Sequence, residues 1–343
     1  MRTVAHAVRS VALTAALTVL LALSNPIPAA AHVVGTGGSP TNYQTAVTGI
    51  RPAVPAVAAT VGLGGQWVRI TNQGAATIVI LGYRGEPFLR LFHNQVEVNQ
   101  LSSTAAQTGL IPVEPAPGSP TTEPRWVRSS EAGSVTWTDA RVAPPRQSQQ
   151  ASQSWELPLV VDGQQVSVVG TRELVPPPSP WPWLVVLVLL TAAVAAIGWM
   201  RDWHRPLATV VAGGVLAFVL HVLGTGFVPQ QNGPVFGWVG VGLVAGFALL
   251  VGAVCAVSAL RRSESAPDRA VTAGAIVLIL AATDISVLWH SQLPFPGPSA
   301  LDRGLTVIAY AAAVGLVIAG ARLVRATRRR TQPGTTQPGT TSG

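Results

Sequence analysis

The chain has 343 residues, of which 48% are apolar, and its formal net charge of +8 comes from arginine alone because it contains no lysine. Residues 32 to 180 nevertheless carry nine arginines and nine acidic residues, so this segment is formally neutral and offers no basic surface to a nucleic acid. The excess positive charge lies at the N-terminus and in short loops of the second half, where it indicates membrane orientation. We therefore expect no nucleic-acid partner.

The first 31 residues have the three parts of a secretory signal peptide. Two arginines precede an apolar run from Val11 to Leu23, and Ala29-Ala30-Ala31 is a small-residue cleavage site. The apolar run is shorter than the roughly 20 residues that a helix needs to cross a bilayer. The pattern predicts a signal peptide over residues 1–31, with His32 as the first residue of the exported chain. An uncleaved signal anchor is the alternative.

Residues 32–175 have the pattern of an extracytoplasmic β-domain. Runs rich in β-branched residues occur at 56–63, 66–71 and 77–82, and the Gly and Asn residues between them indicate consecutive hairpins. Two later runs, 157–161 and 164–169, flank Asp162-Gly163, a dipeptide suited to the positive φ angles of a type I′ turn. Short strands with closely spaced turns predict an all-β fold, an immunoglobulin-like sandwich.

This β-domain has to be held together by packing, because the only cysteine of the chain, Cys255, lies far outside it. Four tryptophans are expected in the core or at its rim, since an indole buries a large apolar area. They are Trp67, Trp126, Trp137 and Trp155. Stacking of one of them on a carbohydrate is the alternative.

Residues 183–326 predict an all-α transmembrane bundle of five helices. The Pro-rich residues 176–182 precede it and should form an extended stalk, because proline fixes φ and lacks an N–H donor. A basic tail over residues 327–343 repeats Thr-Gln-Pro-Gly-Thr-Thr and is expected to be disordered. The five apolar stretches cover residues 183–200, 206–227, 235–260, 270–290 and 305–324.

Arginine placement predicts the orientation of this bundle. Arginines occur in alternate loops and in the tail, whereas residues 228–234 and 291–302 carry none and Arg303 stands at the edge of the second of these segments. Loops with an excess of arginine stay in the cytoplasm. We therefore expect a multi-pass protein of the plasma membrane, in contact with membrane lipid, with its N-terminal domain extracytoplasmic and its C-terminus cytoplasmic.

Two ionisable residues fall inside predicted spans at similar depths. His221 lies in the second span and Asp284 in the fourth. An Asp at the membrane centre costs about 2.5 to 3.5 kcal/mol on insertion scales, so such groups usually face a partner inside the bundle. We expect a His221–Asp284 pair that relays a proton or binds an ion, or one that only fixes helix packing by a hydrogen bond. His290, about 120° further round the helix from Asp284, is expected at the membrane interface beside Trp289.

Several segments resemble a group of uncharacterised multi-pass membrane proteins of high-GC bacteria. They are Gly82–Arg90, Pro124–Val127, Trp137–Arg141 and the Pro-Ser-Pro-Trp-Pro-Trp stalk. The resemblance implies an exported β-domain followed by several helices over most of the chain, and it implies no activity. Members of the group often have His on both sides of the residue that corresponds to Asp139, where this chain has Thr138 and Ala140.

A terminal His32 would also offer copper ligands. Its α-amine and imidazole can chelate one ion, and His93, the other histidine of the exported domain, would complete a three-nitrogen site suited to Cu(II). In this one feature the chain is similar to periplasmic copper-resistance chaperones and to copper-dependent polysaccharide monooxygenases. Their longer motifs are absent from the sequence.

The sequence leaves two hypotheses of function. It contains no nucleophile-elbow motif, no zinc-protease motif and no paired-cysteine motif, so we expect neither an enzyme nor a required cofactor. The first hypothesis is a non-catalytic envelope protein whose β-domain binds an unknown envelope protein or wall component while the helices anchor it. The alternative is copper handling by His32 and His93, with His221, Asp284 and His290 further along the path.

Overall fold

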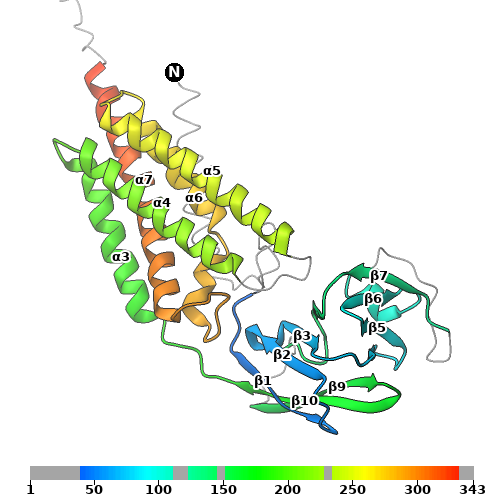
Figure 1. Cartoon of the computed structure of the whole chain (residues 1–343). Helices are drawn as coiled ribbons and strands as arrows, with labels where there is room; N and C mark the ends of the chain where they lie inside the picture. Colours follow the sequence, from blue (N-terminus) through cyan, green and yellow to red (C-terminus); the bar gives the residue numbers. More distant parts are fainter. Residues whose placement is uncertain (1–38, 111–122, 145–150, 228–233, 332–343) are drawn as a thin grey trace, which may run out of the picture.

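The computed structural model of the chain describes residues 39–110, 123–144, 151–227 and 234–331, without the side chains of 234–237 and 329–331. The predicted signal peptide, His32 and the end of the predicted tail lie outside the described residues. Figure 1 shows a β-domain beside one end of a helical bundle.

The β-domain consists of two antiparallel sheets. The larger has seven strands in the order β1-β10-β9-β4-β5-β6-β7, and the smaller has three in the order β2-β3-β8. The strands of the larger sheet are β1 (Tyr43–Arg51), β10 (Gln164–Leu174), β9 (Ser152–Val161), β4 (Ile78–Leu81), β5 (Pro87–Phe92), β6 (Gln95–Asn99) and β7 (Trp126–Ser130). Those of the smaller are β2 (Val57–Gly62), β3 (Trp67–Asn72) and β8 (Ser134–Trp137), and a short helix α2 (Ser103–Gln107) follows β6.

Alternate residues of a strand point to the same face of a sheet. The apolar faces of the two sheets contribute to one core. Ile70 of β3 and Ile80 of β4 are fully buried in it. Trp137 of β8 is also fully buried, and its ring meets that of Phe88 edge to face with the centroids 6.0 Å apart. The antiparallel β-domain predicted from the sequence is therefore present.

The predicted hairpins are confirmed in two cases and wrong in one. The strands β2 and β3 pair with each other, and so do β9 and β10 around Asp162 and Gly163, whose φ angles are 45° and 86°. The strand β4 does not pair with β3 as predicted. It joins the larger sheet between β5 and β9, so residues 73–77 connect the two sheets.

The four tryptophans lie where the sequence predicts them. Trp137 and Trp155 are buried, and Trp67 and Trp126 are half-buried. Two of them stand opposite a glycine of the neighbouring strand, Trp155 opposite Gly170 and Trp67 opposite Gly62. A Cβ at either glycine would overlap the indole, so each ring lies flat over the backbone that the glycine leaves open.

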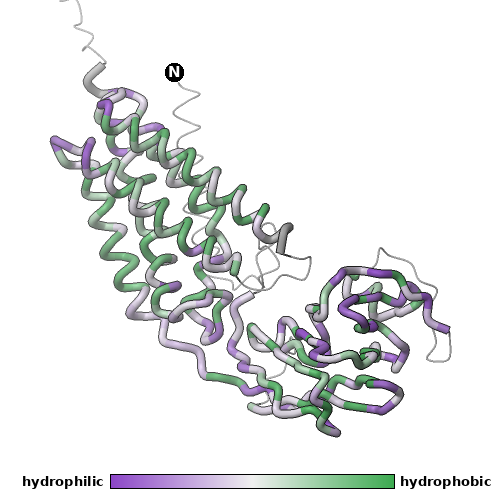
Figure 2. Tube along the Cα trace, viewed as in Figure 1, coloured by the Kyte–Doolittle hydropathy of each residue, from purple (hydrophilic) through white to green (hydrophobic). Residues whose placement is uncertain are grey.

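Among the described residues, the helical half contains four helices long and apolar enough to cross a membrane, over Trp181–Trp199, His204–Gly226, Trp238–Leu260 and Ser299–Arg328. Figure 2 shows apolar residues along these helices and polar residues at the connections. The elements are α3 (Trp181–Ala196) with the 3-10 turn η2 (Ile197–Trp199), α4 (His204–Gly226), α5 (Pro234–Leu260), α6 (Ala266–Leu280), the 3-10 helix η3 (Asp284–Trp289) and α7 (Ser299–Thr331).

The predicted count of five spanning helices is not confirmed. The fourth predicted span, residues 270–290, is divided between α6, which has 15 residues, and η3, with a turn at 281–283 between them. Hydropathy does not register this break, because the residues on both sides of it are apolar.

Helix α7 is the centre of the bundle and packs against α3, α4 and α6. Small residues permit this close approach: a Cβ at Gly214 of α4 would overlap Ala312 of α7, and one at Gly315 of α7 would overlap Val194 of α3. Most of α7 is buried, whereas α3 exposes large apolar side chains such as Val188 and Leu189. An apolar surface of this kind suits contact with lipid.

The β-domain is fixed to the bundle by what we call the docking contact, made by Thr41 and Asn42 with residues 289–292. Thr41 and Gln292 form a two-bond antiparallel bridge, with N···O distances of 2.9 and 2.8 Å. The side chain of Asn42 accepts a hydrogen bond from Ser291 N–H (2.8 Å) and donates one to the Trp289 carbonyl (3.3 Å). The Asn42 carbonyl accepts one from Val175 N–H, where the chain leaves β10 for α3.

Candidate functional site: a buried histidine between two aspartates

The buried ionisable groups of the bundle meet around His221. This residue lies on the inward face of α4, and only 5% of its surface is exposed. Its Nε2 faces Oδ2 of Asp284, the first residue of η3, at 3.4 Å. The structure therefore brings together the two residues that the sequence paired.

Asp302 of α7 is a third member of the site, which the sequence analysis did not find. Its Oδ1 lies 2.6 Å from His221 Nδ1, and the residue is fully buried. The hydropathy pattern predicts a loop at Asp302, yet this residue lies in the first turn of α7. The spacing Ser299-x-x-Asp302 before an apolar run is a helix-start signal that would have placed it on the helix.

The break after α6 is what positions Asp284. The carbonyl of Ala281, left free at the end of the helix, accepts hydrogen bonds from the Asp284 N–H (2.9 Å) and from the Tyr310 hydroxyl of α7. Non-helical backbone at membrane depth is tolerated where it is buried and its polar groups are satisfied. The interruption of the fourth apolar stretch thus turns a carboxylate toward α4.

The surroundings of the imidazole are dry and closely packed. Thr306 Oγ1 lies 3.5 Å from His221 Nδ1, and Phe218 and Tyr310 line the space beside Asp284 together with two alanines. This space has no room for a water molecule. The second carboxylate oxygen of Asp302, Oδ2, is buried and has no hydrogen-bond partner among the described residues.

Arg303 is the cation next to this site. It is 7% exposed and donates hydrogen bonds to the carbonyls of Val287 (3.1 Å) and His290 (2.7 Å) and to Ser299 Oγ (3.1 Å). The two carbonyls belong to η3 and to the residue after it, directly before Ser291 and Gln292 of the docking contact. Arg303 therefore binds the segment that leads to the docking contact, and Asp302, its neighbour in sequence, binds His221.

The other histidines predicted as site residues stay apart from this cluster. The Nδ1 of His290 contacts the Ser286 carbonyl (2.7 Å), so its ring does not join His221. His93 is exposed in the β5–β6 turn, where its ring meets that of Phe92 with the centroids 5.2 Å apart. Within residues 39–331, as far as they are described, no group of three His, Cys, Asp or Glu side chains is arranged to hold a metal ion. His32 lies outside the described residues, and copper binding by His32 and His93 stays a prediction.

Comparison of the chain with protein-family models, with curated proteins and with solved structures finds no match. The resemblance drawn from the sequence segments therefore stays a prediction too.

Those segments do have a clear place in the β-domain. Asp139 is fully buried and accepts hydrogen bonds from Trp137 Nε1 (3.1 Å), from the Arg141 N–H (2.9 Å) and from two nitrogens of the Arg141 guanidinium (2.9 and 2.7 Å). The same guanidinium lies over the Tyr83 ring, 5.0 Å from its centroid. Both oxygens of Asp139 are occupied, which leaves this carboxylate a structural role.

Glu86 has a comparable role at the start of α2. Its Oε1 accepts hydrogen bonds from the Ser102 and Thr104 hydroxyls and from the Thr104 N–H, at 2.8 to 3.1 Å, and its Oε2 accepts one from the Arg84 N–H (3.0 Å). Burial alone would raise the pKa of this carboxyl, but the hydrogen bonds from Thr104 and Ser102 stabilise the charged form and hold the pKa below its ordinary value.

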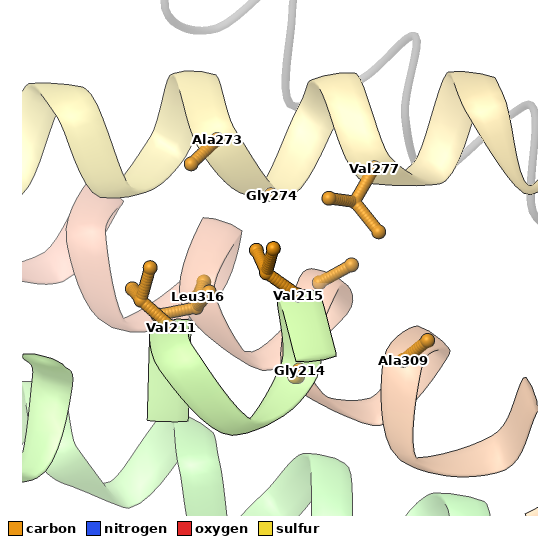
Figure 3. Close-up of a pocket in the computed structure, with 10 residues that line it drawn as sticks. Val211, Gly214, Val215, Ala273, Gly274, Val277, Ala309 and Leu316 are labelled. Atoms are coloured by element: carbon orange, nitrogen blue, oxygen red, sulfur yellow. The ribbon is translucent and has the colours of Figure 1, made fainter. Parts of the chain in front are cut away.

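A cavity between α4, α6 and α7 offers no second site. Figure 3 shows it lined by apolar side chains and by Gly214 and Gly274. Its volume of about 10 Å³ is at the lower limit for a single water, and its lining offers such a water no polar partner. It is a packing defect between small residues.

Proposed function

We propose that the protein is a non-catalytic integral membrane protein of the cell envelope, whose extracytoplasmic β-domain is a binding module anchored by the helical bundle. The observation that carries the proposal is the position of the β-domain, which is docked at the end of the bundle that is poor in arginine. In Figure 1 the α3–α4 and α5–α6 connections and the C-terminal end of α7 lie at the opposite end. The arginines at that far end include Arg201, Arg205, Arg261, Arg262, Arg322, Arg325 and Arg328.

This charge distribution supports a plasma-membrane topology with the β-domain outside, since arginine-rich ends stay in the cytoplasm. In this proposal α6 and η3 together form a fifth membrane crossing, which is interrupted by the turn between them and packs among the four long helices. An interrupted helix fits that place because α7 packs against it and the Tyr310 hydroxyl binds the Ala281 carbonyl that the interruption frees. The two-sheet β-domain fits an immunoglobulin-like sandwich.

A binding role is the better proposal for the β-domain because its buried charges have structural partners. Asp139 and Glu86 are saturated with hydrogen bonds from their own domain. Strand β7, in contrast, ends the larger sheet and exposes four of its five residues. A free strand edge presents backbone groups that a partner can pair with. The proposed partner is another envelope protein or a wall component.

Cysteine labelling tests the topology. In a Cys255→Ala background, Arg84→Cys places a thiol on the exposed surface of the β-domain, and Glu264→Cys places one in the α5–α6 connection. A membrane-impermeant maleimide should label the first variant in intact cells and the second only after permeabilisation. The reverse pattern would contradict the proposed orientation.

Crosslinking tests the binding role. A photo-crosslinking amino acid in place of Arg128 on β7 should give defined adducts in living cells or retain the protein on isolated wall sacculi. The matched control carries the same group in place of Leu189, an exposed apolar residue of α3, which should react with lipid. Identical adduct patterns from both positions, together with no binding to sacculi, would remove the binding-module proposal.

A further inference from the structure

We propose that His221, Asp284 and Asp302 form a proton-binding site, and that the bound proton keeps the β-domain docked on the bundle. The inference goes beyond the proposed function and does not depend on what the β-domain binds. It follows from the geometry of the three groups, from the dry packing around them and from their connection through Arg303 to the docking contact.

The geometry of the imidazole points to a proton beyond its own. Both ring nitrogens face carboxylate oxygens, Nδ1 at 2.6 Å from Asp302 and Nε2 at 3.4 Å from Asp284. A neutral imidazole has one N–H, so one carboxylate would face a nitrogen lone pair. A second proton, either on the ring or on a carboxyl group, would make both contacts attractive. The three groups together therefore hold one proton more than a neutral histidine and two carboxylates.

The charges around the imidazole support this proton count. The titratable groups around His221 are Asp284 from η3 and Asp302 and Tyr310 from α7. The buried cation Arg303 is the next residue after Asp302. The described side chains of α5 and α6 contribute no charged group at this end of the bundle. With the extra proton, one net negative charge remains in the triad, and Arg303 balances it. Without the proton, two carboxylates stand against a single cation. Buried charge without a counter-charge is costly, so the protonated state is the balanced one.

The packing favours binding of a proton over its conduction. The space beside Asp284 and Tyr310 is too small for a water molecule. In the described part of the bundle, the apolar cavity between α4, α6 and α7 is equally unsuited to water. Proton transfer along a path needs a chain of hydrogen-bonded groups, and these residues interrupt it. The partnerless Oδ2 of Asp302 is the atom at which a proton can be exchanged without breaking an existing hydrogen bond.

Arg303 connects the proton to the β-domain. It donates to the carbonyls of Val287 and His290, and the next two residues, Ser291 and Gln292, bind Asn42 and Thr41. Loss of the proton leaves an uncompensated carboxylate next to Arg303 and draws the guanidinium away from these carbonyls. The segment that carries the docking contact then loosens. By linkage, a rise in pH that removes the proton must weaken docking, with a limiting slope of about tenfold per pH unit for one proton.

Hydrogen exchange of the full-length protein in nanodiscs tests the proposal. Exchange at the amides of Thr41 and Gln292 is measured at a series of pH values and corrected for the intrinsic pH dependence of exchange. Wild-type protection should fall as pH rises and approach a tenfold change per pH unit. His221→Gln and Asp302→Asn should each give protection that no longer varies with pH. His290→Gln, which removes the neighbouring histidine outside the triad, should leave the wild-type dependence intact.

Protection that is independent of pH in the wild type, or a dependence that His290→Gln abolishes and His221→Gln preserves, would overturn the proposal. A second measurement needs no variant in the triad. Nitrogen NMR of the ¹⁵N-histidine-labelled protein in nanodiscs should show, near neutral pH, one histidine shielded from solvent exchange. Each of its two ring nitrogens should have the chemical shift of a nitrogen that either carries a proton or accepts a hydrogen bond. A solvent-shielded histidine with one ring nitrogen at the chemical shift of a free lone pair across the same range would count against the bound proton.

Discussion

Asp139 of the β-domain and Asp302 of the bundle are both fully buried, yet their surroundings differ. Asp139 accepts four hydrogen bonds, three of them from Arg141, so that both of its oxygens are satisfied. Asp302 has one close contact with His221, and its other oxygen has none. In the first arrangement the carboxylate has no oxygen left for a proton, whereas the second leaves one oxygen at which a proton can bind. Burial alone therefore does not distinguish a carboxylate with both oxygens satisfied from one with an oxygen available to a proton, whereas the number of hydrogen-bond partners does.

Matched amide substitutions should give the largest difference between the two aspartates. Asp139→Asn removes an ion pair and turns an NH2 group toward N–H donors, so we expect it to destabilise the β-domain by about 3 kcal/mol. In Asp302→Asn the amide oxygen can still accept from His221, and a partnerless nitrogen replaces a partnerless oxygen. We expect it to change the stability of the bundle by less than about 1 kcal/mol.

Pulse proteolysis with identification of the fragments by mass spectrometry reports on each domain separately. Replacement of Arg128, whose exposed pair with Glu131 is worth about 0 to 1 kcal/mol, gives the background expected for a surface charge. Equal losses in the two Asn variants would show that the difference in partners has no energetic consequence.

A smaller effect is expected from the packing of the bundle. Gly214→Ala places a methyl group against Ala312 of α7, and overpacking of this kind costs about 1 to 3 kcal/mol. The adjacent Gly213→Ala meets nothing within 4 Å and should leave stability within about 1 kcal/mol of the wild type. Retention of the monodisperse protein after stepwise heating in detergent compares the two. Similar melting of both variants would indicate that α4 and α7 can move apart to fit the methyl group without loss of thermal stability.

The smallest effect is expected in the stability of the β-domain at acidic pH. The pKa of Glu86 is below its ordinary value in the folded protein, so its stabilising contribution is present above the unfolded value of about 4.3 and is lost as pH falls through the folded value. Glu86→Gln should cost about 1 kcal/mol at pH 7, and the two proteins should converge in stability on acidification. Urea unfolding followed by tryptophan fluorescence between pH 7 and pH 3 measures this. Parallel curves would contradict the role of Glu86.

The sequence predicts those parts of the fold that depend on neighbours along the chain. The Asp162-Gly163 hairpin is such a case, because the turn residues alone determine the positive φ angles. The pairing of β4 was predicted wrongly because β4 lies between β5 and β9 and does not pair with β3. The residues of β9 lie about 80 positions away, and local patterning contains no information about that choice.

The site was predicted in part for the same reason. Ionisable residues in apolar stretches stand out, so His221 and Asp284 could be found and paired by depth. Asp302 stands at the junction of a Pro-rich loop and an apolar run, where hydropathy does not separate loop from helix. The break after Leu280 also escapes a hydropathy window, although the pair Thr283-Asp284 inside an apolar stretch marks its place.

The central position of α7 has a consequence for the order in which the protein is made. Ribosomes make α7 after α3, α4 and α6, so these helices enter the bilayer before the helix that packs between them. Until then the small residues of these helices face lipid or one another, and His221 lacks Asp302. Assembly of the bundle is therefore completed only after α7 has been made. A message truncated before codon 299 would yield helices that insert into the bilayer without the helix they pack against.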